Sequence, residues 1–220
     1  AAGVATLGLW CIRQVPAGRR PVAPTRPPRP GDFYCHAALL PSLILLLLYL
    51  PYGGVIAFIP LVATARGLEN PGFFFTVFAA AMLLVRAKAG QISDRLGRTA
   101  AILPGMLCTG LSLLVLGITT GPGGVLAGAG ILGLGFGSAQ PALMALTADR
   151  VPPEERGKAM GTFYFAWELG IAAGAAASGW LLTVTDFGTL FSAAALIPCA
   201  GAVLTFARRA PRGGPAAHRH

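Results

Sequence analysis

Apolar residues gather along this chain into long runs that alternate with short polar segments. A helix of about 20 apolar residues is long enough to cross the hydrocarbon core of a bilayer. The pattern therefore predicts an all-α membrane protein with six spanning helices, which together form a domain over residues 37–209. We expect these helices over residues 37–62, 72–89, 100–118, 125–148, 157–184 and 189–207.

The flanking segments have a different character. Residues 1–10 are apolar and precede a basic stretch, the opposite of the charge order in a signal peptide, so we interpret them as the end of a preceding transmembrane helix. Residues 11–36 hold five arginines among six prolines and are predicted to be a linker, because proline removes backbone donors and favours extended chain. A proline-rich ligand for an SH3-type domain is the alternative. Residues 210–220 form a polar tail.

The composition agrees with a membrane protein. Hydrophobic residues make up 55% of the chain, charged residues only 11%, and the mean hydropathy is +0.67, whereas soluble domains carry about 25% charged residues. The net charge of +9 raises the question of nucleic acid. The bases lie between the apolar runs and not on one domain face, so the expected partner is the lipid bilayer and not nucleic acid.

The bases also predict an orientation. In the six-helix pattern, Arg66 is the one base that falls in the loops on the other side of the membrane. Because cytoplasmic loops of membrane proteins are enriched in Lys and Arg, we expect the linker, residues 94–98, residues 150–158 and the tail to be cytoplasmic. Arginine outnumbers lysine by 15 to 2 and alanine and glycine are abundant, which is typical of a GC-rich bacterial genome. The predicted location is therefore a bacterial inner membrane, crossed several times.

No cofactor or metal site is predicted. The cysteines and histidines show no ligand-like spacing; they are Cys11, Cys35, Cys108, Cys199, His36, His218 and His220. Residues 128–133 spell a dinucleotide-binding fingerprint, but that motif requires a preceding strand, and here it lies within one apolar run. Gly133 and Gly137 are instead expected to form a ridge of small residues for helix packing.

A charged segment, residues 90–98, separates the second and third apolar runs. We predict a tight turn at the membrane surface. Gly90 would allow two helices to approach closely, and Gly97 would supply a backbone conformation with positive φ. Asp94 is placed either to cap the next helix or to pair with Arg98.

This segment resembles the loop signature of the major facilitator superfamily, Gly-x-Leu-Ala-Asp-Arg-x-Gly-Arg-Lys. The matching positions are Gly90, Asp94, Arg95, Gly97 and Arg98. Ile92 replaces the leucine, and Thr99 stands where a second base is usual. The loop that contains Asp149 and Arg156 resembles the corresponding superfamily loop more loosely.

The resemblance implies a secondary transporter that works by alternating access between two six-helix halves. The basic linker at residues 11–36 occupies the place of the superfamily's interdomain linker, so the chain would be the carboxyl-terminal half, a fragment without its amino-terminal half. Proton-coupled efflux of a drug or small metabolite is the function that the resemblance implies. One alternative is a non-transporting membrane scaffold or regulator derived from such a half. A second alternative is a polytopic membrane enzyme.

Glu168 is the one acid within the predicted spans. A charge at mid-bilayer depth costs about 2.5–3.5 kcal/mol, so we predict a role in proton or substrate coupling, with Tyr164 one turn earlier. The small residues Ala166, Gly170, Gly174 and Ser178 recur every four positions and predict a packing stripe on the opposite face. A structural role for Glu168, tying helices together, is the alternative.

Two further positions are candidates for substrate coupling. Residues 51–54, Pro-Tyr-Gly-Gly, are expected to interrupt the first span near mid-depth and to bring Tyr52 to a binding region; a kink without function is the alternative. Gln140 lies within the fourth span and needs polar partners. It is expected either to face a cavity or to bridge two helices.

Overall fold

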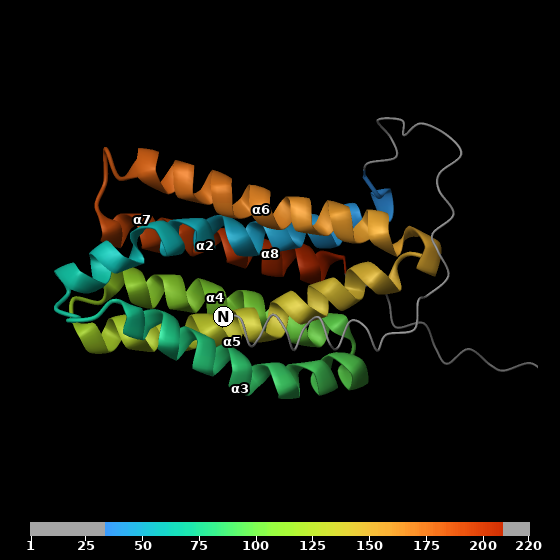
Figure 1. Ribbon diagram of the computed structural model, residues 1–220, viewed down its shortest axis with the longest axis horizontal. Helices are drawn as coiled ribbons and strands as arrows, with labels where there is room; N and C mark the ends of the chain where they lie inside the picture. The colour runs from blue at the N-terminus through green and yellow to red at the C-terminus, as the bar shows by residue number, and fades with distance from the viewer. Residues whose placement is uncertain (1–33, 209–220) are drawn as a thin grey trace, which may run out of the picture. The chain divides into compact units, whose positions relative to one another are not determined.

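The computed structural model describes residues 34–208, and within that range the chain forms helices and no strands. The elements, shown in Figure 1, are η2 (His36–Ala38), α2 (Leu39–Ala65), α3 (Gly72–Leu96), α4 (Arg98–Ile118), α5 (Pro122–Asp149), η3 (Pro153–Glu155), α6 (Arg156–Leu181), α7 (Phe187–Ala194) and α8 (Leu196–Ala207). The predictions for residues 1–10, for the Arg/Pro-rich part of the linker and for the tail concern residues outside this range.

Most of these helices are suited to a bilayer. Four segments of the described chain are long and apolar enough to cross a membrane, namely residues 36–65, 98–118, 122–149 and 187–207, and α3 is a fifth if its two parts, bent by 42° after Arg86, count as one span. The helix α6 has 26 residues, or roughly 39 Å at ~1.5 Å per residue. It is not among these segments: Arg156 and Lys158 lie in its first turn, Glu168 lies at its middle, and it contains many glycines and alanines. The predicted order of helices is confirmed.

The helices pack in a defined order. α6 lies along α2, α3 lies along α5, and α4 packs between α5 and the α7–α8 pair. In Figure 1, α6 and α3 form the two edges of the domain, with α2 and α5 between them. Because α3 and α6 have neighbours mainly on one side, each leaves a broad face uncovered within this domain.

The two ends of the helix bundle differ in charge. The α3–α4 junction, the α5–α6 loop and the end of α8 lie at one end (Figure 1), which carries Arg95, Arg98, Arg150, Arg156 and Arg208. We call it the basic end. Arg66 lies at the opposite end, where its Nη1 donates a hydrogen bond to the carbonyl of Leu116 at 2.6 Å and burial lowers its pKa. The expected segregation of bases is present; the cytoplasmic location of the basic end stays a prediction.

Small residues set the closest helix contacts. A Cβ added to Gly174 would lie 1.8 Å from the carbonyl oxygen of Leu50 on α2, and one added to Gly133 would lie 2.3 Å from that of Phe78 on α3. Ala166, Gly170, Gly174 and Ser178 are all buried. The predicted stripe on α6 and the predicted ridge on α5 are therefore both confirmed as packing surfaces. In lipid such contacts matter more than apolar burial, because lipid tails are as apolar as the side chains.

The expected interruption of the first span is wrong. α2 continues through Pro51 without a break, and Gly53 and Gly54 are buried against α6. A Cβ on Gly53 would lie 2.2 Å from the carbonyl oxygen of Ile171. This tight seam holds the backbone helical although proline removes one hydrogen bond.

The last span was expected to be one helix over residues 189–207, but it is divided at Ala195 into α7 and α8. Pro198 lies one turn after the break. Its ring lacks an N–H for the carbonyl of Ala194 and would clash with that group in a regular helix. Asp186 caps α7, and the hydrogen bonds from the Thr189 hydroxyl and from backbone N–H groups hold the pKa of its carboxyl below the ordinary value.

The predicted turn at residues 90–98 is much shorter in the structure. Residues up to Leu96 continue α3, and Gly97 alone joins α3 to α4 with a φ of 93°. The expectation of positive φ at Gly97 is confirmed, whereas a Cβ on Gly90 would meet no atom within 4 Å, so the predicted close approach there is wrong. At the start of α3, Phe74 is fully buried and Phe73 is exposed.

Candidate functional site

Six aromatic side chains form a continuous row across four helices. Tyr49 of α2 stacks on Trp167 of α6 with ring centroids 4.5 Å apart and lies 5.1 Å from Phe136 of α5. Tyr52 continues the contact to Phe136 at 4.6 Å and to Phe78 of α3 at 5.8 Å. Tyr164 joins the other end at Trp167. We call this set the aromatic row; it consists of Tyr164, Trp167, Tyr49, Phe136, Tyr52 and Phe78.

The aromatic row lies near the middle of the helices. Tyr52 is the central residue of α2, roughly 20 Å from either end at ~1.5 Å per residue. Phe136 likewise occupies the centre of α5. The rings alone account for much of the packing at this depth, because aromatic pairs contribute about 0.5–1.5 kcal/mol beyond the burial of their area.

Tyr164, at the end of the row, and Glu168, beside it, both lie on α6. They are four residues apart and therefore share one side of the helix. The hydroxyl of Tyr164 lies 3.9 Å from Sδ of Met144, which shows that this side of α6 faces toward α5. Both Tyr164 and Glu168 are exposed, in contrast to the buried stripe of small residues. Within the described domain Glu168 is thus not a buried acid that ties helices together.

Gln140 lies on α5 one turn from both Phe136 and Met144, so it shares their side of the helix. Its side chain is half-buried, as is that of Tyr52. All four predicted coupling residues therefore lie in or beside the aromatic row: Tyr52 and Tyr164 belong to it, and Gln140 and Glu168 each lie one turn from one of its members.

Arg86 of α3 is a charged residue that was not among the predicted site residues. Because α3 extends to Leu96, Arg86 lies about 15 Å inside the helix at ~1.5 Å per residue, next to the bend. Its side chain is exposed, as is that of Glu168 on α6. Neither charge takes part in an ion pair with another described residue. The missed signal was the absence of a helix-ending residue before Gly97.

A second polar cluster lies at the basic end, about Arg98. The Arg98 guanidinium pairs with Asp94 one turn earlier, donates from Nε to Asp149 Oδ2 at 2.8 Å, and donates from Nη1 to Ser93 Oγ at 3.2 Å. We call these four residues the Arg98 cluster. It joins the end of α3, the start of α4 and the end of α5.

The other predicted loop residues are not in the Arg98 cluster. Asp94 pairs with Arg98 and does not cap α4, which has no side-chain cap. Arg95 and Arg156 are exposed and form no ion pair with a described residue. Asp149 was placed in the neighbouring loop by the sequence, and its pairing with Arg98 appears only in the structure.

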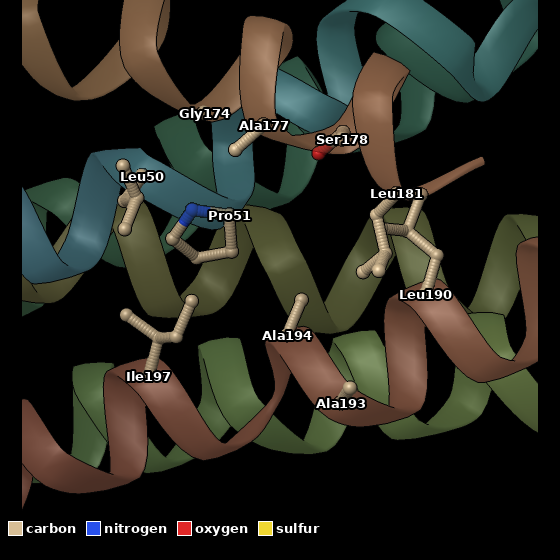
Figure 2. Close-up of a pocket in the computed structure, with 10 residues that line it drawn as sticks. All are labelled: Leu50, Pro51, Gly174, Ala177, Ser178, Leu181, Leu190, Ala193, Ala194 and Ile197. Carbon is tan, nitrogen blue, oxygen red and sulfur yellow. The ribbon is translucent and has the colours of Figure 1, made fainter. Parts of the chain in front are cut away.

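An apolar cavity of about 190 Å³ opens between α2, α6 and the α7–α8 pair. Figure 2 shows Leu50 and Pro51 on one side of it, opposite Ala194 and Ile197. Ser178 supplies the one polar side chain of its lining, and no charged group reaches it. The cavity therefore lacks the chemistry of the aromatic row and of the Arg98 cluster.

The described residues contain no group of three His, Cys, Asp or Glu side chains that could hold a metal ion. Cys35, Cys108 and Cys199 are free thiols. Two polar groups of residues in the described domain are therefore of interest: Glu168 and Gln140 beside the aromatic row, and the Arg98 cluster.

Comparison with known proteins decides the family. The family model described as Major Facilitator Superfamily matches residues 2–219 of the sequence. The chain belongs to the Major Facilitator Superfamily.

Its relatives within the superfamily are longer proteins. The uncharacterized MFS-type transporter STM4428 of Salmonella typhimurium strain LT2 is 30% identical over 148 residues, which are 67% of this chain and 38% of that protein. The uncharacterized MFS-type transporter PA14_38730 of Pseudomonas aeruginosa is 29% identical over 167 residues, which are 74% of this chain and 41% of that protein. The chain thus spans about two fifths of the length of these relatives.

Solved structures show the superfamily fold. The POT family transporter PepTSo superimposes with a TM-score of 0.68 at 18% identity, over 82% of this chain and 38% of that one. The human organic anion transporter MFSD10 (TETRAN) superimposes with a TM-score of 0.66 at 18% identity, over 82% of this chain and 48% of that one. The chain is therefore a multi-pass membrane protein whose described residues form helices, with part of the Major Facilitator Superfamily fold.

Proposed function

We propose that this chain is the carboxyl-terminal six-helix half of a secondary transporter, and that the side of α2, α5 and α6 with the aromatic row forms one wall of the substrate pathway. The observation that carries the proposal is the group of exposed or half-buried polar side chains at mid-helix depth around the aromatic row, above all Glu168. The family supports it, and so do the longer relatives, of which the matched residues cover about two fifths.

An exposed carboxylate at this depth argues for a water-filled pathway. A charged side chain facing lipid at the bilayer centre costs about 2.5–3.5 kcal/mol, and such residues usually face a cavity or a partner helix. Glu168 is turned toward the α5 side, where Tyr164 contacts Met144, and away from the stripe that packs on α2. A second half that closes over this side would enclose Glu168 and Gln140 with the substrate.

The wall has the chemistry for a small amphipathic substrate. The aromatic row offers flat apolar surface and ring faces that attract cations. Glu168 offers a negative charge, and Gln140 offers a donor and an acceptor. In this proposal Glu168 binds the coupling proton in one half of the transport cycle and releases it in the other, so that efflux of substrate is driven by the proton gradient.

The test uses the complete transporter in proteoliposomes, with Glu168→Gln as the variant, because glutamine keeps the shape and removes the titratable group. Glu154→Gln, in the exposed turn η3, is the matched control. We expect Glu168→Gln to abolish accumulation driven by an imposed pH gradient while downhill exchange continues, and Glu154→Gln to behave as wild type. Gradient-driven accumulation at the wild-type level in Glu168→Gln would refute the coupling role. Loss of both activities with normal folding would place Glu168 in substrate binding.

A further inference from the structure

A second cavity opens at the basic end, in the middle of the helix bundle. Its volume is about 290 Å³, close to the lower end of the ~300–1,000 Å³ range of small-molecule sites. It lies between the start of α2, the α3–α4 junction, and the ends of α5 and α8. Its lining includes Arg98, Arg150, Arg208, Leu40, Ile44 and Leu146.

The charges around this cavity are not balanced within the described domain. Arg98 already pairs with two carboxylates, those of Asp94 and Asp149. Arg150 and Arg208 are exposed and form no ion pair with a described residue, and no acidic side chain lines the cavity. Three arginines thus line one cavity, and two of them form no ion pair with a described residue.

The lining combines two kinds of surface. Leucine and isoleucine side chains from α2 and α5 form an apolar part, and the arginines come from the ends and starts of helices. The planar guanidinium fork matches the oxygens of a phosphate and binds them with charge-assisted hydrogen bonds. At the predicted cytoplasmic surface, phosphate is present both as lipid head groups and as free anion.

We propose that this cavity is a binding site for a phosphate anion, held by Arg150 and Arg208 with Arg98 at its edge. The phosphate belongs either to the head group of an anionic phospholipid, whose chain would lie on the leucines, or to free phosphate. Because Arg98 borders the site and also holds Asp149, an occupied site would compete with Asp149 for the same guanidinium. Occupancy would therefore act on the Arg98 cluster, which joins α3, α4 and α5.

The experiment uses the full chain purified in dodecyl maltoside at 150 mM salt, where the Debye length of about 8 Å screens diffuse surface attraction. Native mass spectrometry and thermal unfolding measure binding of dioleoyl phosphatidylglycerol, with dioleoylglycerol as the probe that keeps the chains and lacks the phosphate. Inorganic phosphate is the third probe. The test variant is Arg150→Gln with Arg208→Gln. The matched control is Arg95→Gln with Arg156→Gln, which removes the same charge from exposed positions outside the cavity lining.

We expect phosphatidylglycerol to bind and dioleoylglycerol not to bind. The test variant should bind phosphatidylglycerol at least about tenfold more weakly, the loss expected of one charge-assisted hydrogen bond, and the control should bind as wild type. Displacement by millimolar inorganic phosphate assigns the site to free phosphate, and resistance to it assigns the site to the lipid head group. Equal weakening in test variant and control, unchanged binding in a folded test variant, or failure of both phosphate probes to bind the wild type would overturn the proposal.

Discussion

Replacing Gly174 by alanine tests how the domain is held together. Gly174 lies where α6 crosses α2 most closely, and a Cβ there would be 1.8 Å from the carbonyl oxygen of Leu50, 2.8 Å from its carbonyl carbon and 3.2 Å from its Cα. All three are backbone atoms, so no side-chain rotation relieves the overlap. A relaxed contact between carbon and a carbonyl oxygen is about 3.3 Å, so α6 must move away from α2 by roughly 1.5 Å.

The energy follows from two opposing effects. Overpacking of a close contact costs about 1–3 kcal/mol, and the backbone overlap at Gly174 places it at the upper end of that range. Alanine favours the helix over glycine by about 1 kcal/mol, which offsets part of the loss. The net expectation is a destabilisation of about 2 kcal/mol, or roughly 4–8 °C in melting temperature for a domain of this size.

The assay is thermal unfolding in detergent, followed by helical circular dichroism and by the fluorescence of Trp167 and Trp180, which both lie on α6. Gly161→Ala is the matched control, because a Cβ on Gly161 of the same helix meets no atom within 4 Å. It should melt at or slightly above the wild-type temperature. A Gly174→Ala protein that melts with the wild type, or a Gly161→Ala protein that melts equally early, would refute the close-packed seam.

Two further predictions concern the Arg98 cluster and the membrane topology. Asp94→Asn should leave expression near normal, because an exposed charge pair contributes about 0–1 kcal/mol to stability. A gating role of the Arg98 cluster predicts that the same variant lowers the transport rate of the complete transporter, and an unchanged rate at equal protein level would exclude that role. For topology, reporter fusions at Gly123 and Asp186 should report the outside and a fusion at Arg150 the cytoplasm; a cytoplasmic signal at Gly123 would contradict the six-helix arrangement.

The sequence predicted the helices well because their signal is local. Three signals are properties of single segments: the length of an apolar run, the clustering of bases between the runs, and small residues at every fourth position. The stripe from Ala166 to Ser178 and the positive φ at Gly97 were predicted in this way and confirmed. The residues of the superfamily signature also needed no three-dimensional information to be recognised.

Element boundaries were predicted less well because they depend on neighbours. Glycine and proline at residues 51–54 indicated a break, but the seam with α6 keeps α2 continuous. The last span is divided at Ala195, three residues before Pro198, whose ring cannot donate to the carbonyl of Ala194. Proline thus lies within a continuous helix in one span and follows a break in another, a difference that residue type alone does not predict.

What the sequence by itself determined is the class of protein, its family, the order of its helices and the candidates Tyr52, Gln140, Tyr164 and Glu168. Only the tertiary structure decided that these four lie in or beside one aromatic row, that Arg86 lies inside α3, and that Asp149 pairs with Arg98. The physical reason is that a helix fixes the neighbours of a residue only within its own turns. Contacts between helices depend on how α2, α3, α5 and α6 cross, and that is set by the close approach that their small residues allow.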